Sequence, residues 1–164
     1  MTIVADSSPL IFLGKIRQLP LIPALFGESP LIPASVRDEV MAPPIAPAES
    51  RALRAFLAKC RIVNVARPVC FSTAMSRADN DALTLAIRRR AARLLADDRL
   101  LRDMAAVERI RPMGTVGILL LAMRNRLLTA EETRLHLDAL VSDHRFRIGI
   151  ALYKAVLAGI AEGR

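Results

Sequence analysis

The chain has 164 residues, of which 53% are hydrophobic, and its formal net charge is +8 at pH 7. This length predicts a single domain over residues 1–164 with a real buried core. The longest apolar run, residues 116–123, is far shorter than the roughly 18 residues that a membrane span needs, so we expect no membrane segment. Asp6 interrupts the only early apolar stretch and no basic segment precedes it, which predicts a cytoplasmic protein without a signal peptide.

The first half of the chain alternates short apolar runs with helical patterns. In chain order we predict a strand at residues 2–5, a helix opening at Ser8-Pro9, a helix at 19–26 stopped by Gly27, a strand at 31–32 and helices at 34–41 and 50–59. Residues 42–48, "APPIAPA", are a proline-rich connector.

The second half continues the alternation. We predict strands at residues 62–65, 93–96 and 110–113 and helices at 79–90 (with Asp79 as its N-cap), 100–108, 115–127, 129–143 and 148–162. Thr129 and Glu132 fit a capping box. Strands that alternate with helices predict a parallel sheet covered on both faces, an α/β/α sandwich. The helices of residues 115–162 either form a dimer interface or complete the core.

The basic charge favours a polyanionic partner, either nucleic acid or an acidic protein. Arg88, Arg89, Arg90 and Arg93 form the densest basic patch, although a solvated helix face would look the same. With one Tyr and five Phe, a base-stacking platform is not expected, so contacts to RNA would be mainly to phosphates. No glycine-rich phosphate loop, nucleophile elbow or zinc-binding spacing occurs in the sequence.

Acidic residues from four segments are expected at one edge of this sheet, where ligands of parallel sheets bind. Asp6 follows the first predicted strand, and Asp97 and Asp98 follow the fourth. Glu39 lies in the helix after the second strand. Asp81 lies in the first turn of a helix that runs antiparallel to the strands, so that its N-terminus is at the same edge.

Each of these acids also has a purely structural interpretation. Asp6 could cap a helix, but Ser8 before Pro9 is better placed to do so. Asp98 could be the N-cap of the following helix, and Asp81 could simply favour a helix dipole. Glu39 could be a surface residue.

Clustered carboxylates repel one another unless a cation lies between them. Oxygen ligands suit Mg²⁺ or Mn²⁺, which can lower the pKa of a bound water and stabilise a leaving oxygen. An acidic pocket on a basic chain therefore predicts metal-dependent hydrolysis of nucleic acid.

Four stretches resemble the PIN-domain family, in particular a PIN-like subgroup of unknown function close to the ribonuclease toxins of toxin–antitoxin pairs. They are "IVADSSPLIFLGKI" (3–16), "LIPASVRDEV" (31–40), "DNDALTLAIRRRAARLLADDRLLRDMA" (79–105) and "MGTVGILLLAMRNRLLT" (113–129). The first and the "LLADDRLLR" portion of the third are the most specific, and the resemblance covers nearly the whole chain.

The resemblance implies a PIN-like three-layer α/β/α sandwich and an endoribonuclease that uses Mg²⁺ or Mn²⁺. By position it assigns the acidic site to Asp6, Glu39, Asp81 and Asp98. It further implies RNA as substrate, a homodimer and, for a toxin, a small antitoxin partner.

The sequence departs from the subgroup at two places beside these acids. Ala78-Asp79 replaces the usual Gly-Glu pair, and Ala96 stands where a polar residue often precedes the last acid, so one supporting hydroxyl is expected to be missing. Whether Asp97 or Asp98 binds metal therefore stays open. The alternative function is a catalytically inactive PIN-like module that binds RNA or a protein; a phosphatase on a similar sheet is disfavoured because its nucleophile motif is absent.

Overall fold

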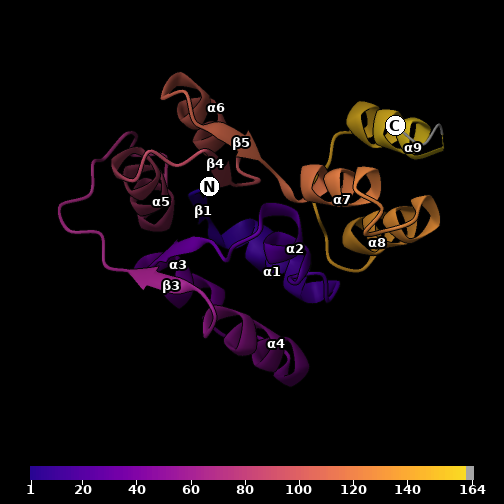
Figure 1. Cartoon of the computed structure of the whole chain (residues 1–164), viewed down its shortest axis with the longest axis horizontal. Helices are drawn as coiled ribbons and strands as arrows, with labels where there is room; N and C mark the ends of the chain where they lie inside the picture. The colour runs from indigo at the N-terminus through magenta and orange to yellow at the C-terminus, as the bar shows by residue number, and fades with distance from the viewer. Residues whose placement is uncertain (162–164) are drawn as a thin grey trace.

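The computed structural model describes residues 1–161, and five short parallel strands form one sheet in the order β3-β2-β1-β4-β5. Figure 1 shows the sheet between helical layers. The strands are β1 (Ile3–Ala5), β2 (Leu31–Pro33), β3 (Arg61–Val63), β4 (Arg93–Leu95) and β5 (Arg111–Met113). All five lie within one or two residues of their predicted positions, and the predicted α/β/α sandwich with a parallel sheet is confirmed.

The helices are α1 (Ser7–Lys15), α2 (Leu21–Phe26), α3 (Ala34–Val40), α4 (Pro47–Leu57), α5 (Arg77–Arg88), α6 (Arg99–Val107), α7 (Thr115–Arg124), α8 (Ala130–Ser142) and α9 (Ile150–Ala161). Helices α5 and α6 pack together on one side of the sheet, whereas α1 packs against α4 and α7 on the other (Figure 1). Glu162, which closes the last predicted helix, lies outside the described residues.

Strand β1 is apolar at every position, and β4 at Leu94 and Leu95, because helices cover both faces of the sheet. All three residues of β1 are buried, as are Leu94 and Leu95 of β4. Leu10 and Leu13 of α1 pack onto this centre, each with no exposed surface. Packing in the core thus fixes the ends of β1 and β4, which Asp6 and Asp97 follow.

Two of the predicted N-caps differ from those in the structure. Helix α1 begins at Ser7 with Asp6 in the N-cap position, so the assignment of Ser8 as N-cap is wrong. Helix α5 begins at Arg77 because Ser76 is the N-cap, and Asp79 completes its capping box instead of capping the helix itself. The predicted capping box of α8, from Thr129 and Glu132, is confirmed.

Backbone hydrogen bonds bring the ends of the central strands together. The Asp6 amide donates to the carbonyl of Leu95 at 2.9 Å, and the Ala96 amide donates to the carbonyl of Met113 at 3.0 Å. The residues that follow β1, β4 and β5 therefore lie side by side at the carboxyl edge of the sheet. Helix α5 returns antiparallel to the strands, which places its first turn at this edge and its last turn about 18 Å away.

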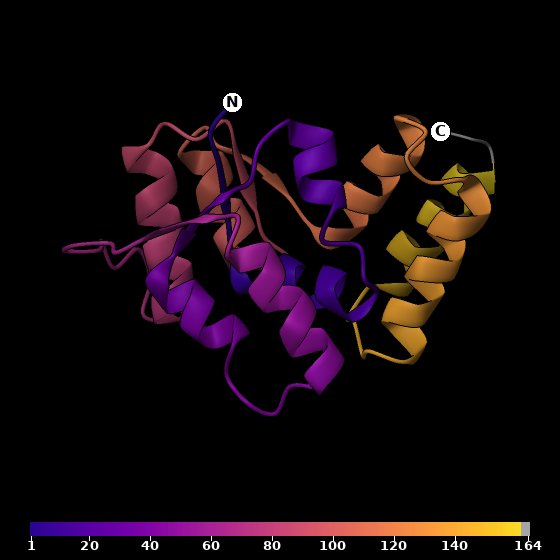
Figure 2. The same ribbon diagram turned by 60° about the horizontal axis from the view of Figure 1, so that its bottom comes forward.

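The C-terminal helices belong partly to the main core and partly to a small cluster of their own. Ile118 and Leu119 of α7 are buried in the main core. Leu137 of α8 packs with Val156 and Ile160 of α9 in the second cluster. Figure 2 shows α7, α8 and α9 gathered at one end of the molecule. Within residues 1–161, none of the helices combines the length and apolarity that a membrane crossing requires.

Candidate active site

Asp6 is a buried carboxylate at the end of β1. It is 1% exposed, its side chain makes no capping hydrogen bond to α1, and its Oδ1 has no hydrogen-bond partner. The pKa of Asp6 is raised from 3.8 to about 7, mainly by burial and further by the negative charges of Asp79 and Glu39. The amides of Ser7 and Ser8 oppose this rise. Asp6 therefore lies in a place that resists an uncompensated negative charge.

Asp81 is a second buried carboxylate with one free oxygen. It lies in α5, is 4% exposed, and its Oδ1 has no hydrogen-bond partner. Its Oδ2 accepts a hydrogen bond of 2.6 Å from the Ser35 hydroxyl of α3, and the Arg77 Nε lies 3.9 Å from the same oxygen. Of the described side chains, only Asp6 and Asp81 bury a polar atom without a partner.

Asp79 and Glu39 lie near enough to Asp6 to raise its pKa, although neither is buried. Asp79 accepts a hydrogen bond of 2.8 Å from the Ser76 amide as the third helical residue of the capping box. Glu39 is exposed on α3 and lines a hollow of about 600 Å³ with Ser35 and Asp81. The structure thus brings Glu39 and Asp81 to the same hollow, and the charge of Glu39 also acts on Asp6.

Asp97 joins the end of β4 to the start of α7. Its Oδ1 accepts from the Thr115 amide at 2.7 Å and its Oδ2 accepts from the Thr115 hydroxyl at 2.6 Å. Burial raises the pKa of Asp97, and the two bonds from Thr115 partly offset the rise. A Cβ added at Gly114 would lie 2.7 Å from Asp97 Oδ1, so glycine allows this close approach.

Asp98 is exposed and acts as the N-cap of α6, accepting from the Leu101 amide at 2.9 Å. This is the structural alternative that the sequence left open for it. Of the two neighbouring acids, Asp97 is the one half-buried at the sheet edge, whereas Asp98 serves the next helix. A metal-binding role for Asp98 stays a prediction.

The donor set fits a hard divalent cation. Among residues 1–161, no three His, Cys, Asp or Glu side chains stand close enough together to hold a metal ion as they lie. Mg²⁺, however, commonly binds through one or two carboxylates and keeps several of its waters. The unpartnered oxygens of Asp6 and Asp81 are buried carboxylate oxygens that such an ion would satisfy. Glu39 is an exposed acid that lines the same hollow as Asp81 and raises the pKa of Asp6.

Sequence reasoning missed two hydroxyl residues that support these carboxylates. Ser35 follows β2 and Pro33, which cannot cap α3 with a side chain. Thr115 follows β5, the strand beside β4, and supplies the supporting hydroxyl that was expected to be absent because Ala96 is apolar. The available signal was position: each residue comes two positions after a strand of the sheet.

The predicted basic patch lies away from these acids. Arg88 is in the last turn of α5, opposite the turn that holds Asp81, and its guanidinium donates to the carbonyls of Ala66 and Arg67 at 2.6 and 2.7 Å. Arg93 lies over the ring of Phe26 at 5.8 Å. Two of the four patch residues, Arg88 and Arg93, thus make contacts within the chain itself.

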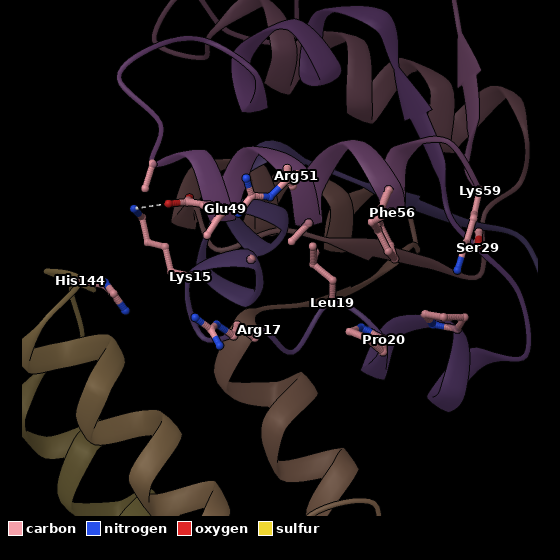
Figure 3. A pocket seen from close by; sticks show the side chains of 16 residues that line it. Lys15, Arg17, Leu19, Pro20, Ser29, Glu49, Arg51, Phe56, Lys59 and His144 are labelled. Atoms are coloured by element: carbon pink, nitrogen blue, oxygen red, sulfur yellow. Dashed lines mark hydrogen bonds and ion pairs between the residues drawn. The ribbon is translucent and has the colours of Figure 1, made fainter.

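A second hollow, of about 740 Å³, opens between α1, α2 and α4 (Figure 3). Its walls are mostly apolar, and four cations surround it: Lys15, Arg17, Arg51 and Lys59. Its one acid, Glu49, forms an ion pair of 3.4 Å with Lys15. None of the predicted site acids lines this hollow.

In a comparison with protein families, the family DUF3368, described as a PIN domain, matches residues 2–162. No curated protein and no solved structure matches the chain.

Proposed function

Because the chain belongs to the PIN-domain family, whose members are generally nucleases that use divalent metals, we propose that it is a metal-dependent endoribonuclease. The observation that carries the proposal is the pair of buried carboxylates, Asp6 and Asp81, each with an oxygen that no protein group satisfies. Buried charge of this kind is costly unless a cation compensates it. RNA phosphodiester bonds are the substrate that a basic chain with an acidic pocket fits best.

In this proposal Asp6 and Asp81 hold the cation, and Glu39 is the exposed acid that completes the set. Mg²⁺ or Mn²⁺, when bound, supplies a water of lowered pKa and positive charge for the phosphate. Ser35 keeps one oxygen of Asp81 engaged, and Asp97 holds the end of β4 against α7.

Arg77 is the residue of this site best placed to contact RNA phosphates. Its side chain is 86% exposed, it lines the same hollow as Asp81, and its Nε lies 3.9 Å from Asp81 Oδ2. An exposed guanidinium at this distance is weakly held and can turn to a phosphate oxygen. Arg37, on the same hollow, is instead bonded to Asp38 at 2.7 and 2.9 Å.

The test is cleavage of total RNA by the purified chain with Mg²⁺, Mn²⁺ or EDTA. We expect cleavage with either metal and none with EDTA, and Asp81→Asn should abolish it. Asp103→Asn is the matched control because Asp103 is an exposed acid of α6 outside the site. If the chain binds RNA but cleaves none with either metal, the inactive binding module is the better description.

We further propose that the chain is the toxin of a toxin–antitoxin pair and that an acidic, amphipathic segment of a small partner protein docks in the apolar hollow of Figure 3. Charge complementarity supports this occupant. Within residues 1–161, Arg17, Arg51 and Lys59 form no ion pair, and Glu49 is already neutralised by Lys15. An acidic segment would meet this excess of positive charge while its apolar face covers the walls.

This second proposal is tested by co-expression with the small protein encoded beside the gene. We expect the two chains to copurify, and the reversal Arg51→Glu with Lys59→Glu to weaken the complex at least tenfold. Arg124→Glu, an exposed change on α7, is the control. Failure to copurify, or a complex equally tight with the double reversal, contradicts the docking site.

A further inference from the structure

The Ser35 hydroxyl does not cap its own helix. Ser35 is the second residue of α3, whose N-cap, Pro33, offers no side-chain hydrogen bond. A serine in the first turn of a helix commonly bonds to nearby backbone groups. Here its hydroxyl instead crosses to α5 and donates to Asp81 Oδ2 at 2.6 Å, over a separation of 46 residues.

The contacts of Asp81 are all on one oxygen. The Ser35 hydroxyl and the Arg77 Nε, the latter at 3.9 Å, both approach Oδ2. Oδ1 is buried and has no partner. A carboxylate with two equivalent oxygens could turn either one toward a ligand, so a short bond to one of them fixes which oxygen stays free.

The bond from Ser35 is also the better placed of the two. The Arg77 side chain is 86% exposed, and its Nε is beyond hydrogen-bond distance. Ser35 is half-buried, and α3 and α5 pack directly against each other at this point. The serine is therefore held by the fold, whereas the arginine is held only by a solvent-exposed ion pair.

We propose that Ser35 is a positioning residue that orients the Asp81 carboxylate so that Oδ1 remains free for a divalent cation. This inference rests on the proposed function, since it assumes that Asp81 binds metal. Hydrogen-bonded partners of metal-ligating carboxylates orient the ligand, and their loss lowers metal affinity roughly 10- to 100-fold.

The test is Mn²⁺ binding by isothermal titration calorimetry, without RNA, on the full chain and its Ser35→Ala and Ser35→Thr variants. We expect Ser35→Ala to weaken Mn²⁺ binding about tenfold and Ser35→Thr to keep most of the affinity because it keeps the hydroxyl. Alanine favours helix more than serine, so α3 should persist in Ser35→Ala, which circular dichroism checks. Ser142→Ala, which removes a helix hydroxyl bonded to the Asp138 carbonyl, is the control and should bind Mn²⁺ like the wild type.

The outcomes separate the inference from the proposed function. Equal Mn²⁺ affinity in wild type and Ser35→Ala overturns the role of Ser35 and leaves the nuclease proposal intact. A weakened Ser35→Ala that Ser35→Thr restores supports the role of Ser35, even if no RNA is cleaved and the nuclease proposal fails. If the wild type binds no Mn²⁺, both fail.

Discussion

The acids in the two halves of the sheet's carboxyl edge differ in their hydrogen-bond partners. In the half built by β1, α3 and α5, Asp6 and Asp81 each bury an oxygen that has no partner. In the half built by β4, α6 and α7, Asp97 gives both oxygens to Thr115, and Asp98 caps α6. All four acids follow strands or open a helix at the same edge, but only the first two keep an unsatisfied, buried oxygen.

The two halves show that a position at the sheet edge does not by itself make a carboxylate available to a ligand. A carboxylate oxygen becomes available when the fold buries it and offers it no hydrogen-bond donor, as at Asp6 Oδ1. Where donors are present, as the amide and hydroxyl of Thr115 are at Asp97, the carboxylate instead stabilises the junction between β4 and α7. The two halves should therefore respond differently to mutation: the first through metal binding and activity, the second through stability.

Asp6→Asn should have the largest effect on activity. Removing the charge of a buried metal ligand is expected to lower metal-dependent RNA cleavage by about 1,000-fold, which corresponds to about 4 kcal/mol. The fold should remain, because Asp6 Oδ1 has no hydrogen bond to lose and the neutral side chain avoids a buried charge. Cleavage assays with Mn²⁺ measure the first effect, and thermal melting at pH 8 without metal measures the second. A variant that cleaves RNA as fast as the wild type would remove Asp6 from the site.

The pH dependence of the free energy of unfolding should report on Asp6, in the half of the edge built by β1, α3 and α5. The pKa of Asp6 is about 7 in the folded chain against 3.8 as its ordinary value, so between these values the folded state binds more protons than the unfolded state. Stability without metal should therefore be greatest near pH 4, fall as the pH rises to about 7, and lose on the order of 4 kcal/mol in that window. Urea unfolding at several pH values measures this loss.

Two comparisons make the pH experiment specific. Asp6→Asn should flatten most of the decline, leaving the smaller share due to Asp97, whose pKa burial also raises. Mn²⁺ at saturating concentration should oppose the decline in the wild type, because the cation compensates the ionised carboxylate. A wild-type stability that does not fall between pH 4 and 7 would contradict the buried, uncompensated charge.

The element order and the edge that carries the acids could be predicted from the sequence because both follow from local patterns. Alternating strands and helices predict a parallel sheet, and a residue directly after a strand must lie at its carboxyl end. Asp6 and Asp97 were placed at the edge in this way, and Asp81 because its helix begins at the same edge. The two wrong N-cap assignments, Ser8 and Asp79, came from choosing among several good capping residues within three positions.

The hydrogen-bond partners of the acids could not be predicted, because they join residues that are distant in sequence. Ser35 reaches Asp81 only because α3 packs against α5, and Thr115 reaches Asp97 only because β5 is next to β4. The sequence therefore located the acids but could not tell which oxygens were free. That distinction separates the two halves of the site.

Asp97→Ala should reduce stability more than activity. It removes both bonds to Thr115, which is completely buried, and leaves its amide and hydroxyl without an acceptor at an expected cost of about 3 kcal/mol. Urea unfolding measures the cost. Thr115→Ser keeps both donors and is the matched control, whereas Gly114→Ala should also destabilise, because its Cβ would lie 2.7 Å from Asp97 Oδ1. A stable Asp97→Ala that has lost all cleavage would place Asp97 among the metal ligands instead.

Asp98→Ala should have the smallest effect of the series. It removes the acceptor for the Leu101 amide, and the loss of an N-cap costs about 1 kcal/mol. Asp98→Asn should cost only a few tenths of a kcal/mol, because asparagine caps helices about as well as aspartate. The two variants separate capping from metal binding, since asparagine keeps the cap but removes the charge. Urea unfolding and Mn²⁺-dependent cleavage should be measured on both. If Asp98→Asn leaves stability unchanged but abolishes cleavage, Asp98 acts in the site as the family resemblance implies, and the second half of the edge is not purely structural.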